Sequence, residues 1–296
     1  MLAVVRAVID LGSNSVLLLV AERDRDNNVV VARDIATITR IGRGVAERGS
    51  LDPAAVTKTL EVLAEYRRIA QSHDAELVAV ATEGLRLASD RDAFVEEASR
   101  TLGVPLTIIS GDEEARLSYL SVAHESAPGP LRVVDIGGAS TELVVGDGVE
   151  IESRVSHRIG SVRLTEQHVH HDPPLPAELE RVAAAARQAL QAQPLAPYRV
   201  LHGLAGTVTT AGALLADLPA YDRDAVDGVT APIADVQALL ERMAAMTTAE
   251  RAAVPTIAAG RADVFVTGLV ILLEVMRHCG ADTLVVRDRG LRYALI

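Results

Sequence analysis

The sequence has very few aromatic residues and more negative than positive charge. Of its 296 residues, 2% are aromatic and none is tryptophan, and the formal net charge is −11. Proteins that bind single-stranded nucleic acid usually stack its bases on aromatic side chains and meet its phosphates with basic residues. The composition therefore predicts that the protein binds no nucleic acid. A local group of arginines can still bind a phosphate inside an acidic protein.

The sequence also lacks a cysteine framework and a long hydrophobic run. Its one cysteine, Cys279, excludes an internal disulfide framework and fits a reducing compartment. The chain does not open with a secretory signal pattern. Its most apolar run, residues 264–276, contains Glu274 and is too short to cross a bilayer. We expect a cytoplasmic protein with no membrane partner.

What the sequence does contain is one motif that occurs twice. The stretch VIDLGSNSVLLLV, residues 8–20, interrupts an apolar run with a carboxylate and four small turn residues, and RVVDIGGASTELVVGDG, residues 132–148, does the same. The matching positions are Asp10 and Asp135, Gly12 and Gly137, Ser15 and Ser140, Leu18 and Leu143, and Val20 and Val145. Each copy is followed by a turn and a third strand pattern. An internal repeat of this kind predicts two domains of the same design.

Helical and strand patterns alternate after each copy, which is typical of an α/β fold. We expect a first domain over residues 1–125 and a second over residues 126–287, with the linker ESAPGPL at residues 125–131. If the two domains face each other, the two glycine-turn loops lie on opposite walls of one cleft.

Four loops of small residues are candidates for binding phosphate: residues 10–15, 135–141, 203–210 and, with a weaker pattern, 288–292. Glycines let the backbone approach a ligand closely, and successive amides or the start of a helix can hold phosphate oxygens. Each loop taken singly is explained by a tight turn. Two equivalent aspartate loops, together with a third loop that enters a helix, favour phosphate binding.

Several carboxylates stand near these loops. Phosphoryl transfer needs Mg²⁺ to neutralise the phosphates and a group that orients or activates the nucleophile. Asp10 and Asp135 are metal candidates, and Glu142 follows the second loop closely enough to reach the same cleft. Glu113 and Glu114 begin a predicted helix, where acidic residues are common because the helix dipole favours them.

The arginines and histidines carry weaker signals. Arg86 follows a predicted strand, at the strand end where open α/β sheets bind ligands. An ordinary surface salt bridge is the commoner explanation for the other candidates, which are Arg116, Arg163, Arg261 and Arg292. The histidine cluster at residues 168–172 lacks the spacing of metal ligands on a helix. We interpret it as a solvated helix end.

Eight of these stretches together resemble the exopolyphosphatase and guanosine pentaphosphate phosphohydrolase family. In chain order they are DLGSNSVLLLV, ATEGLRLASD, ISGDEEARLSYLSV, VVDIGGASTELVV, IGSVRLTE, GLAGTVTT, RADVFVTG and DRGLR, and they extend from Asp10 to Arg292. The family belongs to the superfamily of actin, sugar kinases and heat-shock ATPases. The resemblance implies an α/β fold with two ribonuclease-H-like domains around a central cleft. It also implies a short two-domain form whose last helix, at about residues 288–296, packs back on the first domain.

The resemblance also implies an activity, which is Mg²⁺-dependent hydrolysis of a terminal phosphoanhydride with release of orthophosphate. Glu113 is similar to the base that activates water, and Glu142 to a second acidic residue that assists with water or metal. Asp135 resembles the acidic group near Mg²⁺, with Asp10 opposite. A monovalent cation is a further candidate cofactor. The implied phosphate-binding residues are Ser13, Asn14, Ser15, Arg86, Gly137, Gly138, Ser140 and Thr141, with Gly206 and Thr207 from the third loop.

The substrate and the alternatives stay open at this point. Inorganic polyphosphate and guanosine penta- or tetraphosphate are both candidate partners, and a homodimer is a candidate assembly. One alternative is a nucleotide or alarmone sensor without strong catalysis. It is supported by Ala139, which stands where the family has a third loop glycine, but the presence of Glu113 and Glu142 favours an enzyme. Another alternative is a small-molecule kinase, but the SGDEEAR and GSVRLTE motifs favour a phosphatase.

Overall fold

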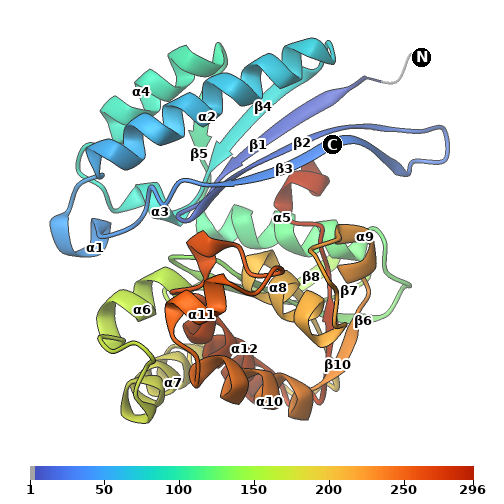
Figure 1. The fold of residues 1–296 in the computed structure, drawn as a ribbon. Helices are drawn as coiled ribbons and strands as arrows, with labels where there is room; N and C mark the ends of the chain where they lie inside the picture. Colours follow the sequence, from blue (N-terminus) through green and yellow to red (C-terminus); the bar gives the residue numbers. More distant parts are fainter. Residues whose placement is uncertain (1–3) are drawn as a thin grey trace. The chain divides into compact units, whose positions relative to one another are not determined.

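The computed structural model describes residues 4–296, except for the side chains of Glu83 and Arg86. The chain forms two compact units (Figure 1). Unit 1 contains the chain up to Leu117 together with Leu291–Ile296, and unit 2 contains Ser118–Gly290. The chain therefore passes from one unit to the other inside helix α5 (Gly111–Ala123). The domain limits expected from the sequence, at residues 1–125 and 126–287, stay a prediction.

Unit 1 is built on a five-stranded mixed sheet in the order β3-β2-β1-β4-β5. Its strands are β1 (Arg6–Leu11), β2 (Ser15–Arg23), β3 (Val29–Ile38), β4 (Glu76–Ala81) and β5 (Leu106–Ile108). The first three form an antiparallel meander, and β4 and β5 continue the sheet in parallel with β1. The first copy of the repeated motif thus forms the first hairpin, with Asp10 at the end of β1.

The helices of unit 1 are α1 (Val45–Arg48), α2 (Pro53–Ser72), α3 (Glu83–Arg86), α4 (Arg91–Leu102) and the first part of α5. Helices α2 and α4 lie side by side on one face of the sheet (Figure 1). There Leu63 and Phe94 join the buried cluster that contains Ile9. The predicted start of α2 is confirmed, because the Asp52 side chain accepts hydrogen bonds from two first-turn amides and Pro53 takes the first helical position.

Unit 2 repeats the plan with one extra strand, in the order β10-β11-β9-β6-β7-β8. Its strands are β6 (Pro130–Ile136), β7 (Thr141–Asp147), β8 (Glu150–His157), β9 (Val200–Leu204), β10 (Thr230–Pro232) and β11 (Thr283–Val286). The strands β6, β7 and β8 form an antiparallel meander, and β9 and β11 continue the sheet in parallel. The second copy of the motif therefore has the same place in its sheet as the first copy.

The remaining elements of unit 2 are α6 (Ser161–His168), α7 (Pro176–Leu190), α8 (Ala205–Leu215), α9 (Arg223–Val226), α10 (Ile233–Ala244), α11 (Thr248–Ala252), a 3₁₀ turn at Ala259–Arg261 and α12 (Phe265–Cys279). Almost every residue of α12 is buried, and the helix packs against α7, α10 and α6. Between residues 4 and 296, no helix has both the length and the apolar character needed to cross a membrane. The predicted α/β fold class with two repeated mixed-sheet units is confirmed.

The last residues of the chain belong to unit 1, where Leu291–Leu295 form a 3₁₀ helix. Leu291 packs with Val80 of β4 in a buried cluster. The Arg292 guanidinium donates to the Asp34 carboxylate at 2.9 Å, and the Tyr293 hydroxyl donates to the same group at 2.7 Å. This segment is shorter than the expected helix at about residues 288–296.

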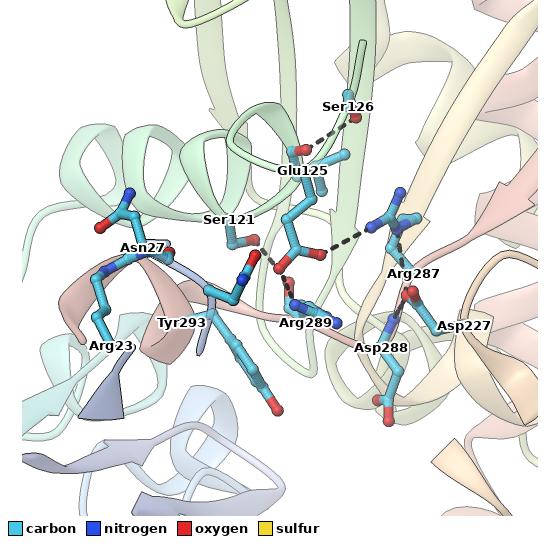
Figure 2. Close-up of polar contacts among 12 residues, drawn as sticks. Arg23, Asn27, Ser121, Glu125, Ser126, Asp227, Arg287, Asp288, Arg289 and Tyr293 are labelled. Carbon is cyan, nitrogen blue, oxygen red and sulfur yellow. Dashed lines mark hydrogen bonds and ion pairs between the residues drawn. The ribbon is translucent and has the colours of Figure 1, made fainter. Parts of the chain in front are cut away.

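Within unit 2, charged residues hold the segment that follows β11 (Figure 2). Arg287 forms ion pairs with Glu125 and Asp227, each at 3.2 Å, and Arg289 forms a second ion pair with Glu125. The Ser121 hydroxyl on α5 donates to the Arg289 carbonyl at 2.6 Å. The segment through which the chain leaves unit 2 is therefore anchored to the C-terminal part of α5.

Candidate active site

The first candidate loop, in unit 1, is a tight turn between β1 and β2. The Gly12 amide donates to the Ser15 carbonyl at 2.9 Å, and Asp10 at the end of β1 is only 8% exposed. The next segment braces the loop, because the Gly42 amide donates to the Ser13 carbonyl at 2.8 Å and the Thr39 amide donates to the Asn14 carbonyl at 3.1 Å. The predicted phosphate-binding residues at positions 13–15 thus occupy a loop of defined conformation.

The second candidate loop, in unit 2, has the same turn. The Gly137 amide donates to the Ser140 carbonyl at 3.0 Å. The start of α6 holds this loop, because the Val162 and Arg163 amides donate to the Gly138 carbonyl at 2.9 and 3.0 Å. These first-turn amides of α6 therefore fix the backbone of the loop and are not left to bind a ligand.

Two side chains, one at the end of this loop and one on α6, make contacts that the sequence did not reveal. The Thr141 hydroxyl is fully buried and donates to the Ile159 carbonyl, so it serves the interior of the unit. The Arg163 guanidinium donates to the Ala139 carbonyl at 2.8 Å. Ala139 does not have a positive φ, so its methyl group causes no backbone strain in the position where the family has a glycine.

Two carboxylates face each other beside the second loop. Asp135 on β6 and Glu142 on β7 are register partners across antiparallel strands, so their side chains project from the same face of the sheet with Cβ atoms about 5 Å apart. Glu142 is only 1% exposed. Like charges in directly opposite positions destabilise a sheet unless something compensates them, and a bound cation would do so.

The donor set at this pair fits Mg²⁺. Hard oxygen ligands suit the ion, which usually keeps several waters and binds through one or two carboxylates together with substrate phosphates. Among the side chains that the structure describes, no group of three or more histidines, cysteines, aspartates and glutamates gathers into a set of metal ligands. A pair of carboxylates therefore matches Mg²⁺ shared with a phosphate substrate better than a metal held by the protein alone.

A hydroxyl group holds each member of the pair. The Ser118 hydroxyl on α5 donates to Asp135 Oδ2 at 2.7 Å, and the Ser156 hydroxyl on β8 donates to Glu142 Oε1 at 2.6 Å. Ser156 is also the register partner of Glu142 across β7 and β8. Neither serine was among the residues expected from the sequence, because only the packing of α5 and the strand register bring them to the carboxylates.

Helix α5 presents Glu113 in its first turn, within unit 1. The Ser110 hydroxyl accepts a hydrogen bond from the Glu113 amide at 3.1 Å and so caps the helix. The Glu113 carboxylate accepts two hydrogen bonds from the Arg116 guanidinium, each at 2.8 Å. Hydrogen bonding to Glu113 raises the pKa of Arg116. The ion pair is about 40% exposed on both sides, so solvent or a ligand can reach it.

The third candidate loop joins β9 to α8 in unit 2. Ala205 has a φ of 67°, in the left-handed region, where a residue other than glycine is strained. A Cβ atom on Gly206 would lie 2.3 Å from an Arg261 nitrogen, so this glycine lets the guanidinium cover the loop. Arg261 also donates to the Thr210 hydroxyl at 2.9 Å, and burial lowers the pKa of Arg261. Thr207 packs against Gly268 of α12.

Other candidates have different places. Arg86 ends α3, and its side chain lies outside the described residues. In unit 2, His171 contacts the buried carboxylate of Glu178 at 2.9 Å, and this hydrogen bond is the main reason why the pKa of Glu178 is lowered to about 2. The histidine cluster thus anchors a turn. Arg261 is the residue that sequence reasoning undervalued, and its only signal was the RADVFVTG motif.

Comparison with known proteins places the chain in a family. The sequence model of the Ppx/GppA phosphatase family matches residues 19–296. Exopolyphosphatase 2 of Mycobacterium tuberculosis is 36% identical over 304 residues, which cover 96% of this chain and 95% of that protein.

Solved structures agree with this result. The crystal structure of the Ppx/GppA family member from Aquifex aeolicus is 32% identical, with a TM-score of 0.84 over 99% of this chain and 96% of that chain. An exopolyphosphatase-like protein is also 32% identical, with a TM-score of 0.91 over 99% of this chain and 97% of that chain. The resemblance inferred from the eight motifs is confirmed: this chain belongs to the Ppx/GppA phosphatase family.

Proposed function

We propose that this protein is a Mg²⁺-dependent phosphohydrolase that removes the terminal phosphate of inorganic polyphosphate and releases orthophosphate. The observation that carries the proposal is the pair formed by Asp135 and Glu142 in register beside a glycine turn. That pair combines ligands for Mg²⁺ with backbone amides for phosphate, as phosphoryl transfer requires. Membership of a phosphatase family supports the same chemistry.

The loops and the carboxylates have separate roles in this proposal. The residues assigned to the phosphate oxygens are Ser13, Asn14, Ser15, Arg86, Gly137, Gly138 and Ser140, with Gly206 and Thr207 from the third loop. Thr141 is left out of this set because its hydroxyl donates to the Ile159 carbonyl inside unit 2. Asp135 and Glu142 would hold Mg²⁺, and Asp10 stays a further metal candidate. A bound ion would supply positive charge that neutralises the phosphates. Catalysis then depends mainly on positioning and electrostatic stabilisation.

Glu113 is proposed as the general base. A carboxylate acts as a base in its ionised form, and the Arg116 guanidinium favours that form. The two hydrogen bonds use one lone pair on each carboxylate oxygen, so Glu113 can still take a proton from water on a second lone pair while Arg116 holds it in place. The water oxygen attacks the terminal phosphorus, and the bond from that phosphorus to the bridging oxygen breaks. The terminal phosphate is released as orthophosphate, and the shortened chain leaves with the bridging oxygen.

Polyphosphate is proposed as the first substrate because a 36% identical relative is named Exopolyphosphatase 2. Guanosine pentaphosphate presents the same terminal anhydride and is the second arm of the test. The sensor alternative is weaker, since Glu113 and Glu142 are both present. A monovalent cation, a homodimer and a cytoplasmic location stay predictions.

The test measures orthophosphate release with Mg²⁺ from short polyphosphate, long polyphosphate and guanosine pentaphosphate. Wild-type protein runs beside Glu113→Gln, which keeps the size of the side chain and removes the base. Asp112→Asn is the matched control, because Asp112 is an exposed acid in the same helical turn. We expect the rate to fall at least about a hundredfold in Glu113→Gln and to stay near wild type in Asp112→Asn. Equal rates in wild type and Glu113→Gln would contradict the assigned base. Absence of release by wild type, together with measurable ligand binding, would favour the sensor.

A further inference from the structure

We propose that Ser118 and Ser156 are positioning residues, whose hydroxyl groups hold the carboxylates of Asp135 and Glu142 in the orientation that binds a divalent cation. The inference rests on the proposed function, because it concerns the same carboxylate pair. It adds two residues from two different elements, α5 and β8, to the machinery of the site.

Ser118 has an unusual hydrogen-bond partner for a serine inside a helix. A serine inside a helix commonly donates to a backbone carbonyl in the preceding turn, and Ser121 does this by donating to the Ser118 carbonyl at 2.7 Å. Ser118 is 0% exposed and instead donates to Asp135 Oδ2 at 2.7 Å. Because this buried hydroxyl donates to a carboxylate on a strand and not to a carbonyl of its own helix, it fixes the rotamer of Asp135.

Ser156 fixes the second carboxylate from the other side. The residues Asp135, Glu142 and Ser156 form one row across β6, β7 and β8, because each is the register partner of the next. Neighbours in such a row project from the same face. The Ser156 hydroxyl donates to Glu142 Oε1 at 2.6 Å, the short length expected for a hydroxyl bonded to a charged acceptor.

The physical reason for two such hydroxyls is the repulsion inside the pair. Two carboxylates in opposite positions repel each other, so each tends to rotate away when no cation is bound. A hydrogen bond from a fixed hydroxyl opposes that rotation before the cation arrives. Outer partners of metal ligands act in this way, and their removal typically weakens metal binding about 10- to 100-fold.

The experiment measures Mn²⁺ binding to the full chain in the presence of orthophosphate, which supplies the phosphate oxygens that the ion is expected to share with the carboxylate pair, and electron paramagnetic resonance quantifies the free ion. Wild type is compared with Ser118→Ala, Ser156→Ala and Ser156→Thr. We expect each alanine variant to bind Mn²⁺ about tenfold or more weakly, and Ser156→Thr, which keeps the hydroxyl, to bind close to wild type. Ser121→Ala is the matched control, because Ser121 is a buried serine of the same helix whose hydroxyl donates to backbone carbonyls.

Thermal unfolding of each variant separates positioning from folding. If Ser118→Ala does not fold, the comparison of Ser156→Ala with Ser156→Thr carries the test. Wild-type affinity in folded alanine variants would overturn the proposal, as would a wild type that binds no Mn²⁺.

Phosphate release by the same preparations keeps the two proposals apart. Release from polyphosphate with unchanged Mn²⁺ binding in the variants leaves the function standing and removes the positioning role. Weakened Mn²⁺ binding in the variants, with no phosphate release by wild type, supports the positioning role and removes the proposed function. Where both hold, we expect a higher Mg²⁺ concentration to restore much of the rate of the alanine variants.

Discussion

The first hairpin of unit 1 and the first hairpin of unit 2 share a backbone but differ in charge. In both, a glycine amide closes the turn onto a serine carbonyl, from Gly12 to Ser15 and from Gly137 to Ser140. In both, an aspartate is the second-last residue of the first strand. The residue opposite Asp10 is Leu17, however, whereas the residue opposite Asp135 is Glu142.

This difference assigns separate tasks to two copies of one motif. An aspartate beside leucine and turn amides suits a phosphate loop with a single carboxylate. An aspartate opposite a glutamate concentrates negative charge that a cation can neutralise. One position, seven residues after the aspartate in each copy, therefore decides which loop is the stronger candidate for the metal.

The largest expected effect comes from making unit 2 like unit 1 with Glu142→Leu. We expect phosphate release to fall at least about a hundredfold, since an electrostatic partner of the transferring phosphate is lost. We also expect the free energy of unfolding to stay level or rise by up to about 1 kcal/mol, because a buried carboxylate opposite another is removed. Steady-state kinetics and urea unfolding would measure both.

Asp147→Asn on the same strand is the control for Glu142→Leu, because Asp147 is exposed at the end of β7. We expect it to change neither quantity. A large loss of stability in Glu142→Leu would show that the glutamate supports the fold, and it would contradict the assignment to the metal.

A smaller effect is expected where glycines brace the two loops. A Cβ atom at Gly160 would lie 2.4 Å from the Gly138 backbone, and one at Gly84 would lie 2.4 Å from the Ser13 hydroxyl. Overpacking of this kind costs about 1–3 kcal/mol. We expect Gly160→Ala to be the more destabilising, because all three of its nearest atoms are backbone atoms within 2.5 Å, whereas at Gly84 only one of the three is backbone, the Ser13 Cα at 2.7 Å. Gly12→Ala, whose methyl would meet its nearest atom at 3.4 Å, is the control in urea unfolding. The reverse order of stability would show that the unit 1 loop is the more rigid.

The smallest effect at neutral pH is expected for His202→Val. His202 on β9 is the register partner of Val133, and Val78 on β4 is the register partner of Val8. Val133 and Val8 have the same position in the two copies of the motif, so the substitution again makes unit 2 like unit 1. Burial lowers the pKa of His202 from 6.5 to about 4, and the charge of Arg287 adds to this shift. As the pH falls, His202 thus takes up a proton near pH 6.5 in the unfolded chain but only near pH 4 in the folded chain.

Wild type therefore loses stability through His202 as the pH falls from about 6.5 to about 4, and this loss ends below that range. We expect wild type and His202→Val to unfold at similar urea concentrations at pH 7. At pH 5 we expect the variant to be the more stable of the two, with the higher urea midpoint. Midpoints that fall in parallel from pH 7 to pH 4 would show that His202 binds its proton equally well in both states.

Much of the fold was predictable because its signals are local. The repeated motif predicted two units, and the alternation of apolar residues with turns predicted the meanders. Asp52 and Pro53 predicted the start of α2. The last segment was less predictable, because its 3₁₀ helix is held by Asp34, which is more than 250 residues away in sequence.

The candidate site, like the fold, was predictable only in part. Which residues are carboxylates, glycines and serines next to a turn can be read from the sequence. That Glu142 stands directly opposite Asp135 depends on the register of β6 and β7, and that Ser118 reaches Asp135 depends on how α5 packs. Arg261 reaches Gly206 only because α8 and the 3₁₀ turn at Ala259–Arg261 meet in unit 2.

The sequence by itself determined the family, the α/β class and the two loops that begin each unit, because these depend on residue types within one turn or strand. The tertiary structure alone decided which carboxylates become neighbours and which hydroxyls hold them. Side-chain partners across strands and helices are set by register and packing, and a shift of one residue would turn each of these side chains to the opposite face of its sheet.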